Sequence, residues 1–163
     1  MSSKISFLVL VVLLFGSLTV SSAQQGGRAG LKIVKEGVGF DGLRVGRSTR
    51  SDIIRKYGRD FRFLKNGKYS YQMKYKNGLS FYYCQSDKVQ QIFDIEIRAP
   101  FKAKTSKGIT LSKSTVSDVR RIYGKAKKGL RYRGVEFYYA EYRGKNVVSV
   151  IDIVESKGLR QCK

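Results

Sequence analysis

The feature that most constrains the fold of this chain is a seventeen-residue block that occurs twice. Residues 42–58, GLRVGRSTRSDIIRKYG, match residues 108–124, GITLSKSTVSDVRRIYG, without a gap. Three blocks that recur in one order indicate a tandem duplication, so we expect the same structural unit twice. The other two blocks are residues 78–83, which match 134–139, and residues 89–95, which match 147–153.

The long block of each half carries the start and stop signals of a short helix. Thr49 and Asp52, and their equivalents Thr115 and Asp118, have the spacing of a capping box, in which a hydroxyl and a carboxylate bind free N–H groups of the first turn. A glycine closes each block and is expected to end the helix in a left-handed conformation. Helices this short depend on packing, because they are marginal in isolation.

Strands are expected after each helix. Residues 68–76 alternate strictly between apolar and polar, which is typical of a strand that is buried on one face. Asn77 and Gly78 then give a hairpin-turn signal, and a third strand is predicted from about 89 to 97. The residues expected to face the core are Tyr69, Tyr71, Met73, Tyr75, Leu79, Phe81, Tyr83, Phe93, Ile95 and Ile97.

The predicted fold class is therefore α+β, with two tandem repeats that each consist of a short helix and a three-stranded antiparallel meander. In the second repeat the strands are expected at about 129–132, 135–142 and 146–154. The sequence leaves open whether the strands form one continuous sheet with the helices on one face. The expected organisation is a signal peptide at 1–23, a partly flexible N-terminal segment at 24–41, repeat 1 at 42–98, a linker at 99–107, repeat 2 at 108–154 and a C-terminal tail at 155–163.

The N-terminus has the pattern of a secretory signal peptide. Lys4 precedes an apolar run over residues 5–15, and Ser21 and Ala23 occupy the −3 and −1 positions of a cleavage site before Gln24. The alternative is a membrane anchor, but the run is shorter than the 18 or so apolar residues that a spanning helix needs. We therefore expect a secreted or periplasmic protein.

The chain has two cysteines, Cys84 and Cys162. In an oxidising compartment an even number of cysteines favours a disulfide between them. The alternative is two separate thiols. Two thiols without further ligands do not make a structural zinc site, and we expect no metal and no cofactor.

Charge is the most extreme property of the composition. The formal net charge is +21, and it falls to +20 once Lys4 is removed with the leader. The halves up to and beyond Arg98 then carry +9 and +11, so the charge covers the whole molecule rather than a basic tail. A chain of this kind attracts polyanions with a steep salt dependence. The alternative is that the charge only keeps the protein soluble.

Most of the 11 tyrosines are interpreted as core residues on alternating strands. Tyr82 and Tyr138 have the opposite parity and equivalent positions in the two halves, so they are expected on the outer face of the sheet. Ile92 and Val150 share that parity and suggest a partly apolar outer face. Exposed tyrosine among cations suits a binding surface. The candidate contact residues are Tyr82, Tyr138, Lys74, Lys76, Arg131 and Arg133.

No catalytic motif is found. The chain has no histidine, which excludes Ser-His-Asp and Cys-His catalysis, and it has no phosphate-binding loop or nucleophile elbow. Asp94 and Asp152 occupy equivalent positions in the two halves and form a candidate carboxylate pair. Because a duplication also copies structural residues, we interpret the pair as structural and predict that the protein is not an enzyme.

The repeated motif Gly-Leu-x-Val-Gly-x-Ser-Thr-x-x-Asp-Ile-x-x-x-Tyr-Gly, followed by a meander, resembles the small exported modules of the outer-membrane assembly lipoprotein BamE (SmpA) group. In tandem it also resembles the β-lactamase inhibitory protein family. The resemblance covers most of residues 42–154 and implies a binding module rather than an enzyme. The chain differs from these modules in three ways. It has Arg59 and Lys125 where such modules often have proline, it lacks a lipid-anchor cysteine, and its charge is more basic.

The function expected from the sequence is a secreted or periplasmic binding module that recognises a protein or a cell-envelope component through the outer sheet face and nearby basic loops. The alternative is a charge-driven polyanion binder that acts on envelope polymers, extracellular nucleic acid or anionic membrane surfaces.

Overall fold

The computed structural model describes residues 30–126, 128–156 and 162. This part contains two helices of eight residues and eleven strands, so the fold is mostly β. The expected signal peptide at 1–23, Lys127 and most of the C-terminal tail lie outside the described residues.

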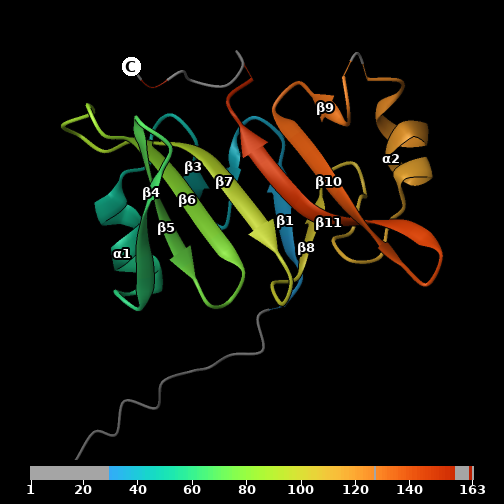
Figure 1. The fold of residues 1–163 in the computed structure, drawn as a ribbon, viewed down its shortest axis with the longest axis horizontal. Coiled ribbons are helices and arrows are strands. Elements are labelled where there is room, and N and C mark those ends of the chain that lie inside the picture. The colour runs from blue at the N-terminus through green and yellow to red at the C-terminus, as the bar shows by residue number, and fades with distance from the viewer. Residues whose placement is uncertain (1–29, 127, 157–161, 163) are drawn as a thin grey trace, which may run out of the picture.

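Seven strands form one antiparallel sheet in the order β4-β5-β6-β7-β11-β10-β9. The strands of the two halves join where β7 pairs with β11, with Ile97 opposite Ile151. Figure 1 shows this sheet across the width of the molecule, with α1 and α2 at its two ends. The strands are β4 (Phe61–Asn66), β5 (Ser70–Tyr75), β6 (Leu79–Cys84), β7 (Ile92–Arg98), β9 (Arg131–Tyr132), β10 (Val135–Tyr142) and β11 (Lys145–Val154).

A second, smaller sheet has the order β3-β2-β1-β8 and lies behind the middle of the large sheet in Figure 1. At one edge of this sheet β8 pairs in parallel with β1, and Ile33 lies opposite Lys104. The strands are β1 (Lys32–Lys35), β2 (Gly39–Phe40), β3 (Leu43–Arg44) and β8 (Ala103–Thr105). β1 and β2 precede the first long block, β3 lies at its start, and β8 precedes the second long block.

The predicted α+β fold of two repeats, each a helix with a three-stranded meander, is wrong. The first helix is followed by four strands, because residues 61–66 pair along their whole length with β5 although their apolar residues do not alternate. The small sheet adds four more strands of two to four residues. Strands this short have no periodicity to detect, and one of the pairings, that of β1 with β8, joins residues about seventy apart in the sequence.

Both helices begin and end where the sequence predicts. In α1 (Arg50–Tyr57), the Thr49 side chain accepts a hydrogen bond from the Asp52 N–H, and the Asp52 carboxylate accepts one from the Thr49 N–H at 2.8 Å. The same capping box opens α2 (Val116–Tyr123), with Thr115 and Asp118 as the pair. A glycine with positive φ ends each helix, as expected.

One hydrophobic core lies between the large sheet, the helices and the small sheet. We call the sheet face that contacts it the inner face and the opposite face the outer face. Ile53 of α1, Val119 of α2 and Val34 of β1 are completely buried in this core. Tyr69, expected to face the core, instead lies in the β4–β5 turn and is 43% exposed. Inner-face residues include Met73, Leu79, Phe81, Ile95, Ile97, Val135, Phe137, Ile151 and Ile153.

A β-bulge reverses two expected orientations in β7. Tyr82 lies opposite Asp94 and Tyr83 lies opposite Ile92, so Phe93 is the extra residue between them. Ile92, which the sequence placed on the outer face, is therefore fully buried in the core. Phe93 lies outside the core and its ring contacts that of Tyr82, with 6.4 Å between centroids.

The turns before and after β2 hold the last residue of each helix, through Glu36 and Asp41 respectively. The Tyr57 hydroxyl donates to the Asp41 carboxylate at 2.9 Å, and Lys32 donates to the same carboxylate. At the other end, the Tyr123 hydroxyl donates to Glu36. The N-terminal segment thus connects the two helices to the small sheet.

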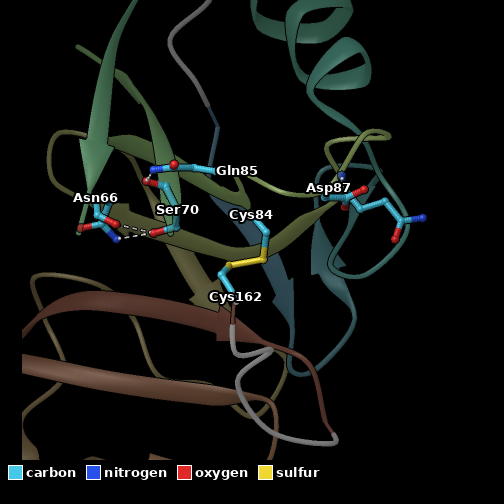
Figure 2. Close-up of a disulfide and its surroundings, with 7 residues drawn as sticks. Asn66, Ser70, Cys84, Gln85, Asp87 and Cys162 are labelled. Atoms are coloured by element: carbon cyan, nitrogen blue, oxygen red, sulfur yellow. Dashed lines mark hydrogen bonds between the residues drawn. A yellow bond between two sulfur atoms is a disulfide. The ribbon is translucent and has the colours of Figure 1, made fainter. Parts of the chain in front are cut away.

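The predicted disulfide between Cys84 and Cys162 is confirmed, with 5.2 Å between the Cα atoms. Figure 2 shows it at the end of β6, next to Ser70. Ser70 pairs with Cys84 in the sheet and donates to the Asn66 carbonyl at 2.6 Å. The bridge therefore ties the C-terminal tail to the large sheet across 78 residues of sequence.

Candidate functional site

The outer face carries a row of polar side chains, one from each of six neighbouring strands. Each residue of the row lies directly opposite the next, because all six strands are antiparallel and in register. Three acidic residues are adjacent in the middle of the row, although like charges directly opposite each other destabilise a sheet. From β5 to β9 the row reads Lys74, Ser80, Glu96, Asp152, Glu136 and Arg131.

A fourth acidic residue, Asp94, precedes Glu96 by two positions on β7 and faces the same side. We call Asp94, Glu96, Glu136 and Asp152 the carboxyl cluster. It gathers four of the 12 acidic residues of a strongly basic chain onto one surface. Asp152 is 7% exposed and Glu136 is 6% exposed, so part of the cluster is shielded from water. Burial of this kind is unfavourable unless each charge is paired or neutralised.

The two glutamates of the cluster each have an arginine and a tyrosine as partners. Arg98 donates to Glu96 from Nε at 2.7 Å and from Nη2 at 3.0 Å, and the Tyr82 hydroxyl lies 3.4 Å from the same carboxylate. On the other side, Arg131 Nε lies 3.0 Å from Glu136. The Tyr138 hydroxyl lies 3.3 Å from that glutamate. The charges at both ends of the cluster are thus compensated within the sheet.

The two aspartates in the middle lack such partners. Among the described residues, neither Asp94 nor Asp152 forms an ion pair with a lysine or arginine. The Oδ1 atom of each is buried and accepts no hydrogen bond from any N–H group in this part of the chain. Asp94 and Asp152 have the same parity on the paired strands β7 and β11, so their carboxyls are neighbours on one face, and a hydrogen bond between them requires a proton on one of them.

Burial is the main cause of an upward pKa shift in both aspartates. It raises the pKa of Asp94 to about 6, and the neighbouring Glu96 and Glu136 carboxylates act in the same direction. The pKa of Asp152 is raised further, again by burial first and then by its contact with Asp94. At neutral pH the pair therefore shares one proton.

Two tyrosines flank the cluster, and they differ in exposure. Tyr138 is 44% exposed, whereas Tyr82 is partly buried and accepts a hydrogen bond from Gln72 at 2.7 Å. Burial and the nearby carboxylates raise the pKa of Tyr82 well above its ordinary value. Arg131, Glu136 and Tyr138 also line a surface hollow of about 380 Å³ next to the cluster.

The structure brings together four of the six contact residues that the sequence singled out. Lys74, Tyr82, Arg131 and Tyr138 lie on the outer face, in or beside the polar row. The other two lie away from it: Lys76 follows the end of β5 and lies 3.7 Å from Asp60, and Arg133 is exposed in the turn between β9 and β10.

Sequence reasoning missed Glu96, Arg98 and Glu136. A signal was present, because Asp94, Glu96 and Arg98 alternate along one strand and Glu136 alternates with Tyr138 along another. Only the pairing of β7 with β11 and of β11 with β10 shows that these positions share a surface.

No family model, curated protein or solved structure matches this chain. The resemblance to the BamE (SmpA) group and to the β-lactamase inhibitory protein family therefore stays a prediction. Within the described residues, no three metal-binding side chains are grouped to hold an ion. Neither helix in that part has the length and apolar character needed to cross a membrane.

Proposed function

We propose that the protein is an exported, non-enzymatic binding module that recognises a protein or a cell-envelope component through the outer face of its large sheet. The observation that carries this proposal is the carboxyl cluster with its flanking tyrosines. Buried aspartates without cationic partners weaken a fold, and proteins keep such features mostly where a surface is used for binding or catalysis. The disulfide between Cys84 and Cys162 fits an oxidising compartment outside the cytosol.

The composition of the outer face supports a protein partner. Tyrosine and arginine are enriched at the energetic centres of protein interfaces, and this face presents Tyr82, Tyr138, Arg98 and Arg131 around the cluster. Tyr139 and Tyr142 on the same hairpin are 55% and 61% exposed. Tyr142 has the same parity as Tyr138 along β10 and adds apolar area at the margin of the face, whereas Tyr139 points to the other side of the strand.

The alternative is a charge-driven polyanion binder, which is favoured by the net charge of +21. The centre of the outer face argues against polyanion binding there, because its carboxyl cluster repels anions. A polyanion would have to bind the basic surface elsewhere. The two functions therefore predict different contact surfaces and different responses to salt.

The test is capture of partners from the exported and envelope fractions of the source organism, with the purified protein as bait at 0.15 M and 0.5 M salt. We compare the wild type with Tyr138→Ala, and use Tyr69→Ala as control because Tyr69 is equally exposed, at 43%, but lies in the β4–β5 turn. A partner that survives high salt, is lost with Tyr138→Ala and is kept with Tyr69→Ala supports the proposal.

The opposite result favours the polyanion function. Binding that disappears at 0.5 M salt, extends to many unrelated anions and is equal in both variants would show that charge alone drives it.

A further inference from the structure

The carboxyl cluster already holds two guanidinium groups. Arg98 binds Glu96 with two hydrogen bonds and Arg131 binds Glu136 with one, so each end of the cluster has its own arginine. The aspartates between them have no equivalent partner among the described residues. The middle of the cluster thus has the same carboxylate chemistry as its ends but lacks the cation.

The charges around the two aspartates leave a local excess of negative charge. Glu96 and Arg98 of β7 face the pair on one side, and Glu136 of β10 with Arg131 of β9 face it on the other, while Tyr82 and Tyr138 contribute neutral hydroxyls. Four carboxyls that share one proton carry three negative charges, of which the two arginines compensate two. The cluster therefore attracts a cation, although the molecule as a whole repels one.

The cluster can be reached from the outer face. Asp152 and the Oδ1 atoms of both aspartates are covered, so the side open to a ligand is that of Asp94, which is partly exposed. The hollow lined by Arg131, Glu136 and Tyr138 lies at the Glu136 end of the cluster. The planar guanidinium group suits this setting because it binds carboxylates through paired N–H groups and stacks on aromatic rings.

We propose that Asp94 and Asp152 form the binding site for one arginine side chain of a protein partner, whose guanidinium takes the place of the proton between the two carboxyls. This inference rests on the function proposed above and names the chemistry that the partner presents. On binding, the O–H bond of the protonated aspartate breaks and its proton passes to solvent, while guanidinium N–H groups donate to both carboxylates. One positive charge replaces another, so the balance of charge in the cluster is kept.

The test uses a small probe rather than the partner. N-acetyl-arginine amide is titrated into the protein carrying ¹³C-labelled aspartate, with the neutral isostere N-acetyl-citrulline amide as the reference, and the side-chain carboxyl signals are followed by NMR. We expect saturable shifts of the Asp94 and Asp152 signals with the arginine probe only. Because binding releases a proton, affinity should rise with pH by up to about tenfold per unit.

Asp152→Asn provides the decisive variant. The asparagine amide donates a hydrogen bond to Asp94 and has no proton that titrates. The pair then cannot exchange a proton for a guanidinium group. We therefore expect this variant to show neither the shift of the Asp94 signal nor the pH dependence of probe binding. Asp60→Asn is the matched control, because it removes the same charge from a side chain that is 85% exposed and distant from the cluster. Probe binding should be unchanged in this control.

Three outcomes would overturn the proposal: no shift with the arginine probe, an equal shift with the citrulline probe, or full binding by Asp152→Asn. Each is distinct from failure of the proposed function. If Tyr138→Ala still loses a salt-resistant partner while the probe does not bind, the outer face is the interface but the aspartate pair is not an arginine site.

Discussion

Replacement of Asp152 by asparagine should stabilise the protein at neutral pH, and the gain should vanish in acid. An aspartate in an unfolded chain has a pKa near 3.9, whereas burial raises the pKa of Asp94 in the folded pair to about 6. The folded state therefore binds a proton more tightly than the unfolded state does. Stability from this source is complete below about pH 4 and is lost progressively as the pH rises toward the raised pKa values of the pair, about 6 for Asp94 and higher for Asp152.

The expected size follows from that shift. A difference of about two pKa units corresponds to about 3 kcal/mol, at about 1.4 kcal/mol per unit. The asparagine amide satisfies the Asp94 carboxylate at every pH, so the variant does not lose this stability. Because the pKa of Asp152 is raised further than that of Asp94, we expect Asp152→Asn to be more stable than the wild type by at least about 3 kcal/mol at pH 8 and by a small fraction of this at pH 4.5.

The assay is urea unfolding of both proteins between pH 4.5 and 8, followed by far-UV circular dichroism. This range avoids the opposite effect of Asp118, whose pKa is lowered to about 2 by its hydrogen bonds to Thr115 and by Arg121, so that its stabilising contribution is lost only in stronger acid. Asp60→Asn is the control for loss of one negative charge. A difference between Asp152→Asn and the wild type that does not change with pH would refute the reasoning.

Two further predictions concern stability. Replacement of both Cys84 and Cys162 by serine should lower the free energy of unfolding by about 4 kcal/mol, because the bridge closes a loop of 78 residues; an unchanged urea midpoint would contradict this. Tyr57→Phe removes the hydrogen bond to Asp41 and should cost about 1 to 2 kcal/mol by the same measurement, whereas Tyr139→Phe, at a position 55% exposed, should cost almost nothing. Equal effects of the two tyrosine variants would show that the Asp41 contact contributes little.

Features encoded in a few neighbouring residues could be predicted from the sequence. The Thr49 and Thr115 capping boxes lie within four-residue segments, and each glycine stop follows directly after its helix. The alternation from Ser70 to Tyr75 needed no knowledge of the partner strand. The disulfide was predictable because two cysteines allow one intramolecular pairing.

Features that depend on register could not be predicted. Phe93 and Ile92 exchanged faces because a bulge opposite Tyr82 inserts one residue into β7, and a strand with a period of two changes face with each inserted residue. The β1–β8 pairing could not be predicted either. Strands of three or four residues are too short to show an alternating pattern and are recognised only from the strand with which they pair.

The sequence by itself determined the helix ends, most strand positions, the disulfide pair and the strongly basic charge. It also marked Asp94 and Asp152 as equivalent carboxylates, without showing that they meet. Only the tertiary structure decided that, because β7 and β11 pair across more than fifty residues and place both aspartates on the outer face, Asp152 between Glu96 and Glu136 and Asp94 two residues before Glu96. The chemistry of this surface arises from the proximity of like charges in a shielded place, and proximity is set by the pairing of distant strands.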